Sequence, residues 1–254
     1  MKKNLKKYIF NHIKKLGVKK NDKILVYSDL SRFGIDNKKL PNIIILSLKK
    51  IIGSGGSIVM PFYILEKKKT YIFNKKKFKF TNKIGSLTRK FCDEKNLIRS
   101  SCLIHNHIGM GPHAKILNLS KEKISIGKGS DFEFMMINNF KLLLLGCDPI
   151  QGATYLHHLE ALYGVPYRKW ITVKKKKIEG KKIKDISVKY FAKKNKKYVS
   201  NFNFIFDKLY NLKKSLHIEK VRYGRSYCIK LKVLHNLVLM LLKKNKYSLV
   251  KKIH

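Results

Sequence analysis

Residues 22–62 read DKILVYSDLSRFGIDNKKLPNIIILSLKKIIGSGGSIVMPF, and the fold class follows from this stretch. Its first apolar run, residues 24–28, is short and β-branched, as expected of a buried strand. Residues 40–52 combine an early proline, helical spacing of apolar side chains and a glycine-rich exit, which predicts a helix. The next apolar run, SIVMPF, predicts a second strand that ends at Pro61. The order strand, helix, strand is a β-α-β unit.

The same pattern continues toward the C-terminus. The apolar run LLLLG at 142–146 suits a central strand, and residues 153–163 predict the helix that follows it. In CLIHNHIGMG, His105 and His107 alternate with apolar neighbours, so we expect them to share one strand face. Residues 171–191, ITVKKKKIEGKKIKDISVKYF, predict an exposed hairpin that turns at Glu179 and Gly180. Further helices are expected at the amphipathic N-terminus, near 86–94 and 130–138, and twice near the C-terminus, the last over 231–242.

Strands that alternate with helices predict an α/β fold. The length suits one large domain, and no linker interrupts the order of elements. We therefore expect a single domain over residues 1–254, with a mixed or parallel central sheet flanked by helices and a lysine-rich β-hairpin.

The charge of the chain is extreme: 58 lysines and arginines face 15 acidic residues, which gives a formal net charge of +43. Apolar residues make up 44% of the chain, too many for a disordered polycation. So positive a surface attracts polyanions, and non-specific binding to RNA has to be considered. Almost all of the charge is lysine, spread in short runs without an aromatic ladder, which compositional bias of the coding sequence explains equally well.

The longest apolar stretches, residues 43–48 and 233–242, are shorter than the roughly 20 residues of a bilayer-spanning helix. The four cysteines show no CxxC pairing and no density typical of secreted scaffolds, which favours reduced thiols. We expect no membrane span and a cytoplasmic protein.

The densest group of reactive side chains lies in GCDPIQGATYLHHLEALYGVPYR, residues 146–168, directly after a predicted strand. Ligands of open α/β sheets bind at such strand ends. Thr154, His157 and Glu160 follow one another at helical spacing, so neighbouring pairs share a face. An imidazole held by a carboxylate can act as a general base, although a surface His-Glu pair has the same spacing.

These motifs, in this order, resemble the aminoglycoside 3-N-acetyltransferases, which transfer acetyl from acetyl-CoA to an amine of an amino sugar. The resemblance runs nearly end to end, and the T-x-x-H-x-x-E after the LLLG strand is its most specific part. The matching segments are LGVKKNDKILVYSDLSRFGI (16–35), GSGGSIVMPFY (53–63), GSLTRKFCDEKNLIRSSCLIHNHIGMGPHA (85–114), GKGSDFEFMMINNFKLLLLG (127–146), TYLHHLE with the later Tyr-Arg, and GRSYCIKLKVLHNLVLMLLKK (224–244).

The resemblance implies an acetyl-CoA-dependent N-acetyltransferase of the antibiotic-resistance type. It places His157 at the reaction centre as the general base of a direct transfer without a covalent enzyme intermediate. Thr154 is the nearest donor for the oxyanion, and Glu160 orients His157 or holds the ammonium groups of the substrate. The CoA side is implied to use the N-terminal loop, which consists of Ser28, Asp29, Leu30, Ser31 and Arg32.

On the substrate side we expect His105, Asp148 and Glu160. A polycationic aminoglycoside approaches this chain against its field, which favours an amino sugar that is anionic overall, such as a nucleotide-linked one. The chain also departs from the family where a His-Pro is common, since it has Cys102 and Leu103 there.

Four alternatives remain open. A strand His-x-His pair and a helical histidine can hold zinc, but the proposed transfer needs no metal and none is expected. Cys102 lies near His105 in sequence, yet no nucleophile elbow accompanies it. A lysine-rich RNA-binding protein on a catalytically decayed acetyltransferase fold would need no His157, and a second enzyme hypothesis is acyl transfer to another amine.

Overall fold

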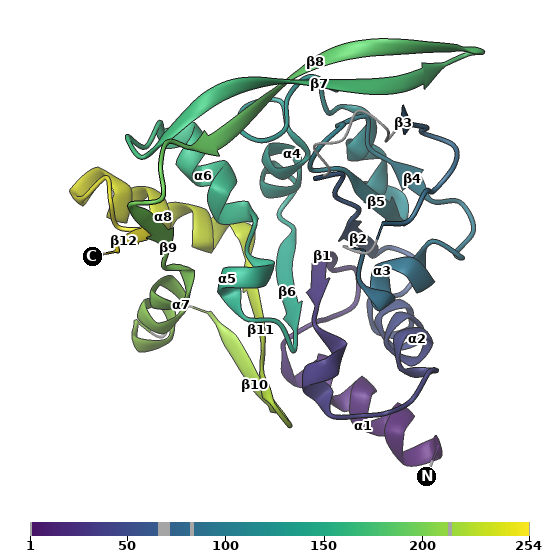
Figure 1. The fold of residues 1–254 in the computed structure, drawn as a ribbon. Coiled ribbons are helices and arrows are strands. Elements are labelled where there is room, and N and C mark those ends of the chain that lie inside the picture. Colours follow the sequence, from purple (N-terminus) through teal and green to yellow (C-terminus); the bar gives the residue numbers. More distant parts are fainter. Residues whose placement is uncertain (1, 66–71, 82–83, 213–214, 254) are drawn as a thin grey trace.

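Strand β1 (Lys23–Ser28) is the middle strand of a seven-stranded sheet in the computed structural model, which describes residues 2–65, 72–81, 84–212 and 215–253 (Figure 1). The strand order is β10-β11-β6-β1-β2-β5-β4. β1 pairs in parallel with β2 (Ser57–Pro61) and with β6 (Lys141–Leu145), and the outer pairs are antiparallel. The predicted mixed sheet is confirmed, and the carboxyl ends of its three parallel strands meet at one edge.

The remaining elements follow in chain order. The helices are α1 (Lys2–Lys15), the 3-10 helix η1 (Leu30–Phe33), α2 (Leu40–Ile52), α3 (Ser86–Phe91), the 3-10 helix η2 (Pro112–Asn118), α4 (Asp131–Ile137), α5 (Pro149–Gly152), α6 (Tyr155–Tyr163), α7 (Phe202–Asn211) and α8 (Leu231–Lys244). The other strands are β3 (Ile72–Phe73), β4 (Ile98–Arg99), β5 (His107–Met110), β7 (Arg168–Glu179), β8 (Lys182–Lys193), β9 (Tyr198–Ser200), β10 (His217–Val221), β11 (Gly224–Lys230) and β12 (Val250–Lys252).

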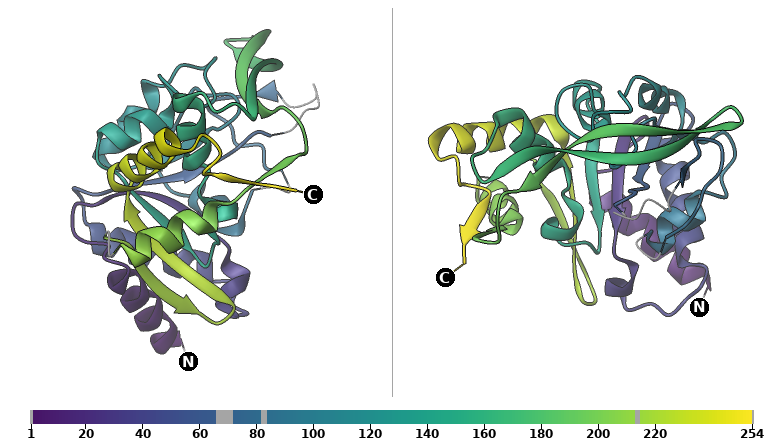
Figure 2. Two further views of the ribbon diagram at one scale, coloured as in Figure 1. Left: turned by 90° about the vertical axis from the view of Figure 1, so that its left-hand side faces the viewer. Right: turned by 45° about the horizontal axis from the view of Figure 1, so that its top comes forward.

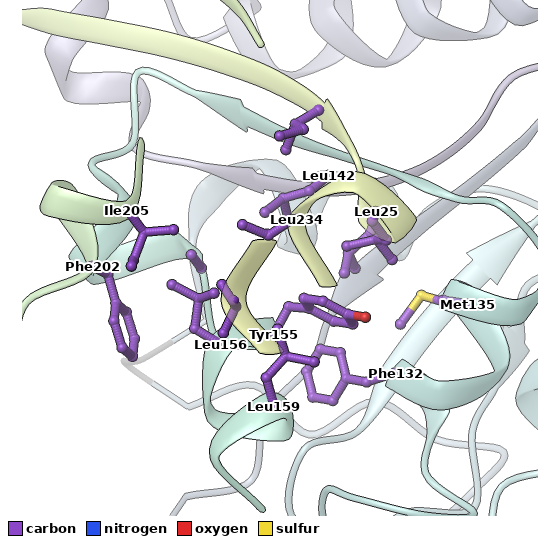
Figure 3. Packing of buried hydrophobic residues seen from close by; sticks show 14 of the residues in the cluster. Leu25, Phe132, Met135, Leu142, Tyr155, Leu156, Leu159, Phe202, Ile205 and Leu234 are labelled. Atoms are coloured by element: carbon purple, nitrogen blue, oxygen red, sulfur yellow. The ribbon is translucent and has the colours of Figure 1, made fainter. Parts of the chain in front are cut away.

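Helices cover both faces of the sheet, because alternate side chains of a strand point to opposite faces. In β1, Ile24 and Val26 pack into a core with α1, α2 and α3, whereas Leu25 and Tyr27 pack into a second core. That second core holds the apolar faces of α4, α6, α7 and α8, and Figure 3 shows Tyr155 of α6 beside Phe132 of α4 within it. Burial on both faces explains why these strands read as continuous apolar runs.

The hairpin of β7 and β8 differs from its prediction in two respects. Its turn is Gly180 and Lys181, since Glu179 still pairs with Lys182. It belongs to a separate three-stranded sheet with β3 and not to an edge of the central sheet. Figures 1 and 2 show it as a long ribbon that crosses one end of the molecule above α6 and α4.

Two further expectations need correction. His107 begins β5, but His105 precedes that strand, although both rings contact Tyr63 at centroid distances of 5.0 and 5.4 Å. Residues 224–230, which the sequence joined to the closing helix, form strand β11.

Within the described ranges, no helix is both long and apolar enough to cross a membrane.

Candidate functional site

A cavity of about 580 Å³ lies at the edge where the parallel strands end. Such an edge is where open α/β sheets bind ligands, and the volume is in the range of small-molecule sites. Its walls come from the end of β1 and the loop after it, from the segment after β2, from α3, and from the segment between β6 and α6. The lining residues are Tyr27, Ser28, Asp29, Leu30, Ser31, Pro61, Tyr63, Leu65, Ile84, Gly85, Ser86, Thr88, Cys147, Gln151 and Thr154.

The structure thus brings four of the five expected CoA-loop residues to the same cavity as Thr154. The fifth, Arg32, does not line it. Its Nη2 lies 2.8 Å from Oδ2 of Asp148, and its Nε lies 3.4 Å from Oδ2 of Asp29. Arg32 therefore ties the loop after β1 to the start of α5. Asp148 lines a second, smaller cavity of about 250 Å³ together with Arg225.

Gly146 directly follows β6 beside this loop and has a φ of +61°, a conformation that costs other residues strain. A Cβ there would lie 2.6 Å from the carbonyl oxygen of Asp29. We expect Gly146→Ala to destabilise the protein by more than the ~1–2 kcal/mol of the backbone strain alone, and to raise KM for acetyl-CoA.

Gly180→Ala is the matched control, because Gly180 has a φ of +62° but a Cβ there meets no atom within 4 Å. Thermal unfolding and initial rates on both variants separate the strain from the steric contact. Equal losses in the two variants would contradict the role given to the close approach at Asp29.

His157 and Glu160 lie together on α6, and the chain segment after α6 completes their environment. Nδ1 of His157 is 2.6 Å from Oε2 of Glu160, and the hydroxyl of Tyr167 donates to Oε1 at 2.9 Å. Nε of Arg168, at the start of β7, lies 2.7 Å from Oε2 of Glu160, an ion-pair contact whose angles are not those of a hydrogen bond. Nη2 of Arg168 lies 3.0 Å from Nδ1 of His157. Glu160 is fully buried, whereas 27% of the His157 side chain is exposed.

The charge state of Glu160 follows from these contacts. Burial raises the pKa of the carboxyl, but the hydrogen bonds from His157 and Tyr167 and the charges of His157 and Arg168 outweigh it and lower the pKa overall. Glu160 is therefore an ionised carboxylate that accepts a hydrogen bond from Nδ1–H of His157. Nε2 of His157 makes no hydrogen bond within the described part of the chain. The pair is arranged as a base with its orienting carboxylate.

Thr154 immediately precedes α6, and its side chain makes no capping hydrogen bond to the helix. Its side chain instead lies beside the phenols of Tyr27 and Tyr63, whose pKa values it helps to lower, and the two phenols hydrogen-bond to each other. Burial raises the pKa of both phenols, so both are neutral donors.

His105 is buried next to the cavity wall. Its Nδ1 is 2.5 Å from the hydroxyl of Ser125, and its ring stacks on Tyr190 of β8. Burial, followed by the nearby His157 and His107, lowers its pKa to about 3, so it is a neutral ring.

Of the described residues, no group of three or more His, Cys, Asp or Glu side chains is arranged to hold a metal ion. All four cysteines are free. Cys102 is 1% exposed, and burial raises the pKa of its thiol, so it lacks the thiolate that a nucleophile needs.

Sequence reasoning missed several side chains of this site. Tyr167 and Arg168 form the Tyr-Arg of the matching segments, but nothing in the sequence indicates that they contact Glu160. One feature of the sequence points to Tyr63 as a site residue, which is its place just after a predicted buried strand. His107 and Asp131, which pair in the interior, are far apart in sequence, and no spacing rule connects them.

The family model for aminoglycoside 3-N-acetyltransferase matches residues 25–243. A relative from Bacillus subtilis (strain 168), the SPbeta prophage-derived aminoglycoside N(3')-acetyltransferase-like protein YokD, is 27% identical over 187 residues, which is 65% of this chain and 67% of the relative.

Solved structures share the fold. The crystal structure of YokD from Bacillus subtilis has a TM-score of 0.81 at 22% identity and covers 96% of this chain and 94% of its own. The AAC-IIIb binary complex with CoASH has a TM-score of 0.81 at 16% identity, covering 94% and 96% of the two chains. Sisomicin-bound AAC-VIa has a TM-score of 0.81 at 14% identity, covering 94% and 97%.

Proposed function

Because this chain belongs to the aminoglycoside 3-N-acetyltransferase family, we propose that it transfers acetyl from acetyl-CoA to the amine of an amino sugar. One observation carries this proposal. His157, held by buried Glu160, stands one helical turn from Thr154, which lines the same cavity as the loop proposed to receive CoA. The family is one of acetyl-CoA-dependent N-acetyltransferases, so an enzyme is expected at this site.

In the proposed step, Nε2 of His157 removes a proton from the acceptor amine as its nitrogen attacks the thioester carbonyl. A C–N bond forms, the carbonyl oxygen becomes an oxyanion, and the Thr154 hydroxyl donates a hydrogen bond to it. The C–S bond then breaks, and the CoA thiolate takes the proton from His157. Glu160 is a positioning residue in this scheme, since its buried oxygens are occupied by His157, Tyr167 and Arg168.

The acceptor is proposed to be an amino sugar that is anionic overall, for example a nucleotide-linked one. The acidic side chains at the site already have cationic partners, since Glu160 pairs with Arg168, and Asp29 and Asp148 pair with Arg32. They offer little to a polycationic aminoglycoside, while the net charge of +43 attracts phosphates.

Thiol release from acetyl-CoA tests both parts of this proposal, with a panel of aminoglycosides and nucleotide-linked amino sugars as acceptors. We expect kcat/KM to be at least about ten-fold higher for the anionic acceptors at low salt, and to fall as ionic strength screens the field. Faster release with aminoglycosides would contradict the preferred acceptor and leave the transferase intact. No release with any amine, together with tight and salt-sensitive RNA binding, would favour the non-enzymatic alternative instead.

We place the reaction in the cytoplasm. Four unpaired cysteines support this location, because reduced thiols are usual there.

A further inference from the structure

Two histidine-carboxylate pairs lie near the cavity, and the proposed reaction uses only the first. The second joins His107 of β5 to Asp131 of α4, with Nδ1 2.7 Å from Oδ2 and side chains that are 0% and 1% exposed. The other oxygen of Asp131, Oδ1, has no hydrogen-bond partner among the described residues. Buried ion pairs add little net stability, and an oxygen without a partner adds a cost. Stability alone therefore does not explain this pair.

The opposite side of His107 faces the cavity wall. Its Nε2 is 3.5 Å from the hydroxyl of Tyr63, and the two rings meet edge to face. The Tyr63 hydroxyl bonds to the Tyr27 hydroxyl, and the Thr154 side chain lies beside both phenols. A series of polar groups thus leads from a buried carboxylate to three hydroxyls that line the cavity.

Each hydroxyl has only one proton to donate, so the partners of one hydroxyl restrict its neighbours. The Asp131 carboxylate only accepts, so Nδ1 of His107 donates to it, and the ring is held with Nε2 toward the Tyr63 hydroxyl. The Tyr63 and Tyr27 hydroxyls bond to each other, so a contact that holds one phenol also holds the other. The Thr154 side chain lies beside both phenols at the cavity.

We propose that His107 and Asp131 are positioning residues that hold the hydroxyls of Tyr63 and Tyr27 in one orientation at the cavity wall, beside Thr154 and the reacting carbonyl. This inference rests on the proposed acetyl transfer for its effect on rate. The orientation of the hydroxyls is a property of the protein itself.

Two conservative variants test the series, Asp131→Asn and Tyr63→Phe. The first replaces the carboxylate that accepts from Nδ1 of His107, and the second removes one hydroxyl while keeping the ring. Each is expected to lower kcat about ten-fold, a fraction of the effect of losing an oxyanion donor outright, with KM for acetyl-CoA changed by less than about two-fold. The double variant should lose no more than either single one, because both break the same series. Additive losses, or losses in KM alone, would overturn the inference.

Tyr155→Phe is the matched control and should leave kcat unchanged. Tyr155 adjoins Thr154 in sequence, and its ring is 6.0 Å from Phe132, which also packs on His107 (Figure 3). Its hydroxyl, however, bonds to His235 outside the series. An equal loss in this variant would show that any buried hydroxyl of this core matters, against the inference.

Nitrogen-15 NMR of the His107 ring reports the hydrogen bonds of both ring nitrogens without any turnover. We expect the Nδ1 signal to shift in Asp131→Asn and the Nε2 signal to shift in Tyr63→Phe. An Nε2 signal that stays unchanged in Tyr63→Phe would overturn the inference. If no amine releases thiol while the NMR pattern is as expected, the proposed function fails and the orientation of the hydroxyls stands.

Discussion

His157→Ala is expected to lower kcat for amine-dependent thiol release by about 10²–10⁴-fold, the usual contribution of a general base. The imidazole is the only group of the Thr154, His157 and Glu160 set with a nitrogen free to accept a proton, since Nδ1 is engaged by Glu160. KM for acetyl-CoA should change little, because the expected CoA loop follows β1 and does not belong to α6. Initial rates at saturating acceptor measure the effect.

His217→Ala serves as the control, because His217 is an exposed histidine on β10, away from the cavity. It should retain full activity. Retention of more than about a tenth of the rate by His157→Ala would remove His157 from the role of general base, whatever the acceptor.

Arg168→Ala is expected to destabilise the protein by about 3–5 kcal/mol at neutral pH, because it leaves the Glu160 carboxylate buried against fewer partners. Glu160 is fully buried and Arg168 is 7% exposed, so solvent does not screen the pair. Urea unfolding measures the loss of unfolding free energy. Arg222→Ala, which removes an exposed arginine, should cost less than about 0.5 kcal/mol.

The pH dependence of that loss has a definite sign. The native pKa of Glu160 is lowered, so its stabilising contribution is present above the unfolded pKa of about 4.3 and is lost as pH falls through the native value. Without Arg168, burial acts against fewer opposing contacts and the native pKa rises. The deficit of Arg168→Ala should therefore be largest at neutral pH and shrink toward acidic pH.

A second substitution checks the cause. Adding Glu160→Gln to Arg168→Ala removes the stranded charge and should recover part of the stability. A double variant that is less stable than Arg168→Ala would mean that the arginine acts through packing and not through charge.

Secondary structure near the site could be predicted well where its signals are local. Helix α2 has the predicted bounds, Leu40–Ile52, because Pro41 near its start and Gly53 at its end mark it within the sequence itself. Strands β10 and β11 were not foreseen as a pair, since β11 joins the sheet through β6, more than seventy residues away in the chain. That pairing depends on contacts that no local pattern encodes. The single domain over residues 1–254 stays a prediction.

The candidate site divides in the same way. Thr154, His157 and Glu160 lie within seven residues of one another, so helical spacing alone predicts that His157 and Glu160 meet. The resemblance implies a place for Arg32 on the CoA side, and the fold supplies Asp29 and Asp148 as its partners. Charge in a sequence does not reveal which counter-charge a tertiary contact will bring.

The sequence by itself determined the α/β class, the β-α-β core and the His157–Glu160 pair, because each depends on residues within one or two turns or one strand of each other. Only the tertiary structure decided that Arg168 would neutralise Glu160 and that the cavity would gather its walls from separate parts of the chain. It also decided that His107 would meet Asp131 and Tyr63. These contacts join segments through packing of the whole chain, and a buried charge acquires its partner only when that packing closes around it.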